Sequence, residues 1–152
     1  MSQRTVVVGT DGSRTAEEAV RHAARIAAEH DAKLVVVTAY ERHRTQEDGI
    51  DRTPGELRWL LTDPAQAEGR AEAGRDIALA EGATRVAVRA VEAKPVAALV
   101  EVARSEQADV LVVGSRGLAS PAHVVRGSVA SGVLDKAPCR VVVVDTDHLA
   151  GR

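Results

Sequence analysis

Aromatic side chains are almost missing from this sequence of 152 residues. It has one tyrosine, Tyr40, one tryptophan, Trp59, and no phenylalanine. A hydrophobic core must therefore be built from valine, leucine, isoleucine and alanine, which a hydrophobic content of 45% allows. A chain of this length can bury roughly two thirds of its surface on folding. We expect one domain over residues 1–152.

The sequence also lacks the features of proteins that bind nucleic acid, cross a membrane or carry disulfides. Its single cysteine, Cys139, excludes an internal disulfide and a CxxC motif. The net charge of −2 argues against a dedicated nucleic-acid binder, which would usually carry a basic excess. No apolar run approaches the ~20 residues of a membrane span, and the N-terminus lacks the apolar core of a signal peptide. We expect a cytoplasmic protein.

Five short runs rich in β-branched residues are bounded by turn residues. Runs of this kind are typical of strands buried on both faces of a sheet. The predicted strands are Val6–Val8, Lys33–Tyr40, Arg85–Val91, Asp109–Gly114 and Val141–Val144.

Apolar residues at helical spacing predict a helix between consecutive strands. Thr15 and Glu18 form a capping box for the first helix. Asp63-Pro64 opens the second, Pro95 the third, and Ser128 lies near the start of the last. Residues 41–62 are polar and irregular, and a loop of this length is unusual and is expected to be either functional or mobile.

Alternating strands and helices predict a three-layer α/β fold, with a parallel sheet and helices on both faces. Right-handed crossovers leave few topologies, and we expect a doubly wound, five-stranded sheet in the order 3-2-1-4-5. Ligands of such sheets bind beyond the carboxyl ends of the strands, where the winding reverses. In this order the reversal falls between strands 1 and 4, which lead into residues 9–13 and 114–117.

The most specific motif follows the fourth strand. Gly114, Gly117 and Gly127-Ser128 form the pattern G-x2-G-x9-G-S. Glycines allow close backbone approach to a ligand, and free amides at a helix start attract anions. Arg116 adds positive charge, and no acidic residue interrupts positions 114–134. The segment therefore suits a phosphate chain, although it is neither a Walker A loop nor a Rossmann fingerprint.

With these motifs the chain resembles the universal stress protein family, on its ATP-binding branch. The resemblance rests on residues 8–13, Ala93-Lys94-Pro95, the glycine motif through Val129, and Ala137-Pro138-Cys139. It implies a homodimer, often formed through the last strand. It implies ATP, with Mg²⁺ carried on the phosphates, as the ligand. It also implies that the ligand is held by Thr10, Asp11, Ala39, Gly114, Ser115, Arg116, Gly117, Gly127, Ser128 and Val129.

In this interpretation Asp11 contacts the nucleoside, the end of the second strand near Thr38-Ala39 lies against adenine, and the glycine motif binds ribose and phosphates. Nucleotide occupancy would regulate the dimer or an unidentified protein partner during stress, with at most slow ATP hydrolysis and no catalytic residue. Three alternatives remain open. They are a phosphohydrolase that uses Asp11, a nucleotide-free interaction protein, and cAMP as the ligand. Asp11 could also serve only as a turn residue, because Asp-Gly is a turn signal.

Overall fold

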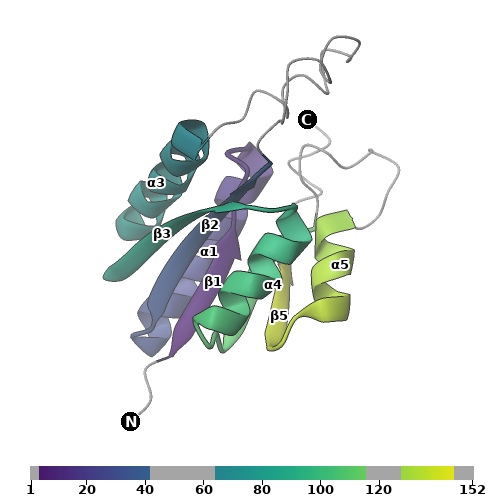
Figure 1. The fold of residues 1–152 in the computed structure, drawn as a ribbon. Helices are drawn as coiled ribbons and strands as arrows, with labels where there is room; N and C mark the ends of the chain where they lie inside the picture. Colours follow the sequence, from purple (N-terminus) through teal and green to yellow (C-terminus); the bar gives the residue numbers. More distant parts are fainter. Residues whose placement is uncertain (1–3, 42–63, 116–127, 146–152) are drawn as a thin grey trace.

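The computed structural model describes residues 4–41, 64–115 and 128–145. Within these ranges, strands and helices alternate along the chain (Figure 1). The elements are β1 (Thr5–Gly9), α1 (Arg14–His30), β2 (Lys33–Tyr40), α3 (Pro64–Ala80), β3 (Arg85–Glu92), α4 (Pro95–Ser105), β4 (Val110–Gly114), α5 (Ser128–Lys136) and β5 (Arg140–Val144).

The five strands form one sheet in the order β3-β2-β1-β4-β5, and every neighbouring pair is parallel. Val7 of β1 lies opposite Val35 of β2 on one side and Leu111 of β4 on the other. The predicted topology and strand order are therefore confirmed. β1 lies at the centre, and β3 and β5 are the two edges.

α1 and α3 cover one face of the sheet, and α4 and α5 cover the other (Figure 1). Val6 and Val8 pack in a cluster with apolar residues of α1 and α3, whereas Val7 packs with residues of α4 and α5. This division follows from the alternation of side chains along a strand. Both faces of the strands are therefore buried, and this explains why their sequences are unbroken apolar runs.

The core contains the small aliphatic residues that the composition predicts. Its largest fully buried side chains are leucines and valines, together with Thr38. Alanines line the strand-facing sides of α1 and α3, so these helices approach the sheet closely. Close approach compensates for the missing aromatic volume, because protein interiors pack without voids.

The predicted capping box at the start of α1 is wrong. Ser13 is the N-cap residue, and its Oγ accepts a hydrogen bond from the Ala16 amide at 3.2 Å. Thr15 is buried in the first turn, where its hydroxyl lies 3.1 Å from that of Ser13. The predicted starts at Pro64 and Pro95 are confirmed, while Asp63 lies outside the described residues.

Candidate functional site

The turn between β1 and α1 is held by its own side chains. The Gly12 amide donates to Oγ1 of Thr10 at 3.1 Å, and the Ser13 amide donates to Oδ1 of Asp11 at 2.9 Å. Gly12 has φ +85°, a left-handed conformation that glycine adopts without strain. The turn therefore has a defined shape before any ligand arrives.

This hydrogen bonding decides what the turn can bind. The amides of Gly12, Ser13, Ala16 and Glu17 are all satisfied within the turn and the first helical residues. A phosphate would need free amide donors, so these four groups do not form an anion site. Asp11 has a second carboxylate oxygen, which accepts hydrogen bonds and suits a hydroxyl or amine donor.

The turn after β1 and the end of β4 lie side by side, at the end of the sheet where the carboxyl ends of the parallel strands meet. β1 and β4 are hydrogen-bonded neighbours with Val8 opposite Val112, so Thr10 and Asp11 follow one strand and Gly114 and Ser115 end the other. The Thr10 amide donates to the Val37 carbonyl, and the Ser115 amide donates to the Val144 carbonyl. Both segments are thereby fixed to the strand on their far side.

The remaining predicted site residues have different placements. Ala39 lies near the carboxyl end of β2, half-buried, on the α4 side of the sheet. Ser128 is the first residue of α5, and Val129 packs against the cluster beneath α4 and α5. Arg116, Gly117 and Gly127 lie outside the described residues.

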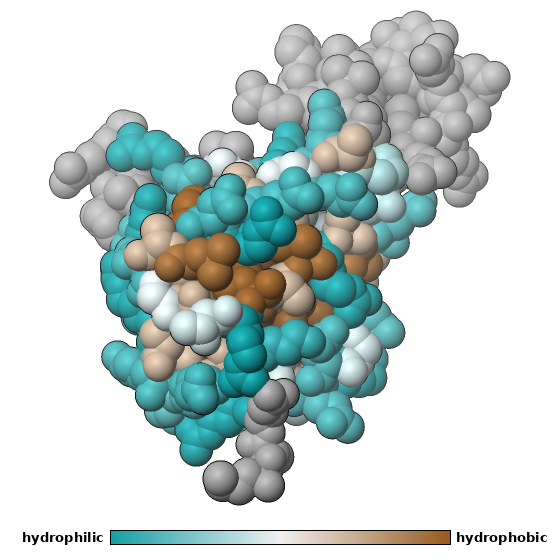
Figure 2. All heavy atoms as spheres, turned by 90° about the vertical axis from the view of Figure 1, so that its left-hand side faces the viewer, coloured by the Kyte–Doolittle hydropathy of each residue, from teal (hydrophilic) through white to brown (hydrophobic). Residues whose placement is uncertain are grey.

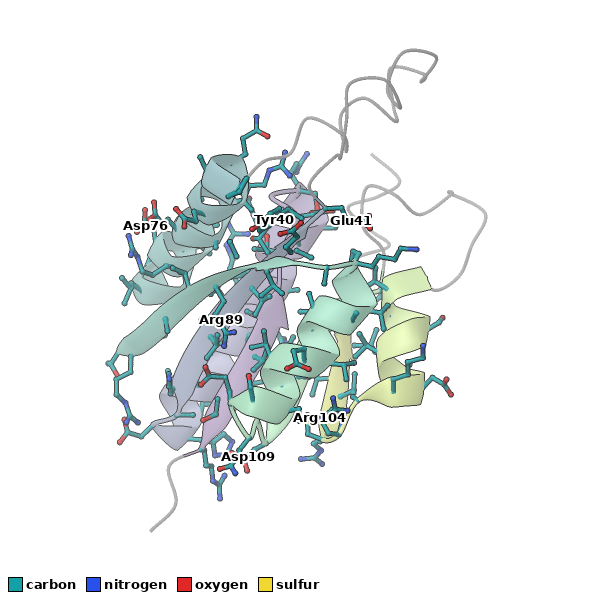
Figure 3. All side chains as sticks on the ribbon, in the orientation of Figure 1. Tyr40, Glu41, Asp76, Arg89, Arg104 and Asp109 are labelled. Carbon is teal, nitrogen blue, oxygen red and sulfur yellow. The ribbon has the colours of Figure 1, made fainter. Side chains whose placement is uncertain are left out.

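The resemblance implies that the end of β2 near Thr38-Ala39 lies against adenine, but the side chains of these two residues point to opposite faces of the sheet. Val36 belongs to the cluster under α1 and α3, and alternation puts Thr38 on that same side. Thr38 is 1% exposed, and its Oγ1 has no hydrogen-bond partner among the described residues. Only Ala39 lies on the side that α4 covers. Figure 3 shows the next residues, Tyr40 and Glu41, at this end of β2.

Cys139 lies at the other end of the sheet from these residues. It comes directly before β5, so in a parallel sheet it lies at the end where strands begin. Figure 3 places Asp109, which precedes β4, at the same end. Burial raises the pKa of the Cys139 thiol, and the Asp109 carboxylate raises it further. A raised pKa lowers the thiolate fraction of Cys139, and the thiolate is the nucleophilic form of cysteine.

Sequence reasoning missed a hollow between α1 and α3. Its volume is about 340 Å³, and Thr10 and Gly12 line it together with residues of both helices. Glu17 and Arg70 are among these residues, 53 positions apart in the chain. No local spacing could have indicated that they meet, because only the packing of α3 beside α1 brings them together.

Comparison with known proteins decides the family. The model of the universal stress protein family matches residues 3–145. The chain belongs to the universal stress protein family. Universal stress protein Rv1636 of Mycobacterium tuberculosis is 38% identical over 143 residues, which cover 94% of this chain and 97% of that protein. Universal stress protein MJ0531 of Methanocaldococcus jannaschii is 30% identical, with 93% and 81% covered.

Solved structures of universal stress proteins share the fold. A crystal structure of a universal stress protein in complex with cAMP is 37% identical, with TM-score 0.67, and covers 95% of this chain and 98% of its own. UspA of Lactobacillus plantarum aligns with TM-score 0.75 at 24% identity, covering 95% and 99%. In the described parts of our chain, no helix has the length and apolar character needed to cross a membrane. The same residues hold no group of three or more His, Cys, Asp or Glu that could bind a metal.

Proposed function

We propose that this chain binds an adenine nucleotide, ATP in the first place, at the carboxyl ends of β1 and β4. The observation that carries the proposal is the meeting of two turns, Thr10-Asp11 and Gly114-Ser115, at the point where the winding of the sheet reverses. The solved relative with bound cAMP supports a nucleotide as the ligand. A role in the stress response follows from the family.

The hydrogen bonds of the β1–α1 turn favour separate binding segments for the nucleoside and the phosphates. Asp11 uses Oδ1 to hold Ser13, which leaves Oδ2 to accept from a ribose hydroxyl or the adenine amine. The phosphates would then be bound by Gly114–Gly117 and Gly127-Ser128, and the positive charge of Arg116 would attract them. Mg²⁺ would travel on the phosphates, because it is commonly bound through phosphates, waters and one or two carboxylates.

Two assays test the ligand and its binding segment. Mass spectrometry of the small molecules released by heating the purified protein should identify an adenine nucleotide. In calorimetry with ATP, Gly127→Val should abolish binding, since a side chain there blocks backbone approach. Ala122→Val adds apolar bulk at one of the nine variable positions between Gly117 and Gly127, where no glycine is required, and should bind normally. A folded Gly127→Val protein with wild-type affinity would remove the glycine motif from the site.

cAMP is the second candidate, favoured by the solved relative that contains it. Parallel titrations with ATP and cAMP decide between the two by the ratio of their affinities. Rapid release of inorganic phosphate from ATP, lost in Asp11→Asn, would instead favour a phosphohydrolase. A protein that carries no nucleotide and gives no calorimetric signal with either ligand would be an interaction protein without a nucleotide.

We propose further that nucleotide occupancy controls association, through a homodimer formed at the β5 edge or through a protein partner. The nucleotide segments and β5 are directly connected, because the Ser115 amide donates to the Val144 carbonyl at 2.8 Å. A ligand that contacts residues 114–117 would therefore act on a segment hydrogen-bonded to the edge strand. Sedimentation with and without saturating ATP tests this coupling.

A further inference from the structure

The hollow between α1 and α3 lies behind the turn that presents Asp11. Thr10 and Gly12 line it on the side of the turn, and Ala73, Gly74 and Ile77 of α3 add apolar atoms to its lining. Asp11 is not among its lining residues, whereas Thr10 lines it and also belongs to the turn of the proposed nucleotide site. At about 340 Å³ it lies at the lower end of the range for ligand pockets.

Two opposite charges line this hollow without a partner. Glu17 and Arg70 are both half-buried, and neither side chain makes a hydrogen bond or ion pair with any residue that the structure describes. Every other half-buried charged side chain in the described ranges has such a partner. Arg21 pairs with Glu18, and Arg89 and Lys33 both pair with Glu106. The two exceptions therefore occur together, at one place.

The Arg70 side chain is held in position by the turn. A Cβ atom at Gly12 would lie 3.3 Å from Cγ and 3.4 Å from Cδ of Arg70, so the arginine stem packs on the bare glycine backbone. Arg70 and Glu17 both line the hollow, and they do not form an ion pair with each other. A partly buried charge is costly unless an opposite group compensates it.

We propose that the hollow binds a small zwitterion of the α-amino-acid class. A guanidinium presents two parallel donors that match the geometry of a carboxylate. The Glu17 carboxylate on the other helix complements an ammonium group, and the apolar lining residues of α3 suit a short aliphatic body. One molecule with both charges compensates Glu17 and Arg70 together, which neither a simple anion nor a simple cation achieves. This site is additional to the proposed nucleotide site.

Calorimetric titration of the full chain with each of the twenty proteinogenic amino acids tests the proposal. At least one should bind the wild type. Arg70→Gln keeps the stem over Gly12 and Glu17→Gln keeps the shape of its side chain, and each should weaken that binding by about 10- to 150-fold. Arg75→Gln, on the same helix but paired with the exposed Asp76, is the matched control and should bind normally.

The nucleotide titration separates this proposal from the previous one. Arg70→Gln should keep its ATP affinity within about twofold of wild type. Asp11→Asn, which keeps an acceptor oxygen for the Ser13 amide, should keep its affinity for the amino acid. Circular dichroism confirms that each variant is folded. The proposal fails if no amino acid binds the wild type, if both glutamine variants bind it as well as wild type does, or if ATP displaces it competitively.

Discussion

Two glycines of α3 provide a matched pair of substitutions with opposite expected effects on stability. Gly69 is exposed, and a Cβ atom there would meet nothing within 4 Å. Gly74 is buried against the sheet, and a Cβ atom there would lie 2.8 Å from Cγ1 of Val36. Optimal carbon–carbon contacts are about 3.5–4.0 Å. Both changes to alanine give the same gain in helix propensity, so the packing difference is isolated.

The magnitudes follow from these two environments. Replacing glycine by alanine inside a helix stabilises by about 0.5–1 kcal/mol, and Gly69→Ala should show this gain. Gly74→Ala has the same gain but adds a methyl group against a fully buried valine, whose β-branched side chain has little rotamer freedom. Overpacking of this kind costs about 1–3 kcal/mol. Gly74→Ala should therefore be less stable than Gly69→Ala by about that amount.

Urea denaturation followed by circular dichroism measures the difference. All samples should have one protein concentration, because association makes apparent stability concentration-dependent. In a thermal melt, the gap corresponds to about 2–4 °C per kcal/mol for a chain of this size. Equal stability of the two variants, or a more stable Gly74→Ala, would show that α3 is not packed on β2 as described and would refute the reasoning.

Two further predictions concern single side chains. Asp11→Ala should weaken adenosine as well as ATP by about 10- to 150-fold in calorimetry, the value of one charged hydrogen bond, and equal affinities would leave Asp11 only its turn role. Alkylation of Cys139 should be slower at pH 8 than that of an unfolded control, because its raised pKa reduces the thiolate. Asp109→Asn removes the carboxylate that helps to raise the pKa of Cys139, so the pH–rate profile of alkylation should move to lower pH. An unchanged profile would exclude a contribution of this carboxylate to the pKa.

The fold was predictable because several independent patterns agreed. Apolar runs such as Val141–Val144 predict strands covered on both faces, and the alternation with helices predicts parallel pairing. Local chemistry was less decisive at the start of α1. Ser13 and Thr15 are both good N-cap residues, and only the path of the turn, with Gly12 in a left-handed conformation, selects Ser13.

The candidate site was predictable where it depends on topology. The turns after β1 and β4 meet because the strand order brings them together, so Asp11 and Gly114 follow from the pattern alone. Glu17 and Arg70 could not be found in this way. Each is a charged residue of the kind found on any helix surface. That they lack partners is known only once the ion pairs of the described residues are known.

The two edges of the sheet differ in how well they resist pairing with another chain. β3 is the longer edge, and Figure 2, which views the side of α3 and β3, shows a hydrophobic area enclosed by hydrophilic residues. Arg85 begins this strand and Arg89 lies within it. Nη1 of Arg89 lies 3.2 Å from Oε2 of Glu106. Charged side chains on an edge strand disfavour association. β5 begins at the exposed Arg140, and none of its other residues is charged; the exposed Asp145 follows the strand.

Proline substitutions at both edges test which one forms the proposed homodimer. In a parallel sheet, the amide and carbonyl of a residue point to the same neighbour, and successive residues alternate. Val144 accepts from Ser115 of the β4 side, so Val143 points its amide away from the sheet. Tyr40 accepts from Ala93, which likewise directs the Val88 amide to the free side of β3.

Val143→Pro and Val88→Pro therefore each remove one outward donor while the ladders inside the sheet remain complete. Because a bare edge of four valines pairs with its own copy about a two-fold axis, the wild type should sediment as a dimer. Val143→Pro should shift it toward monomer, and Val88→Pro should leave it dimeric. The reverse result would assign the interface to β3, and a wild type that is monomeric at high protein concentration would refute dimerisation through either edge.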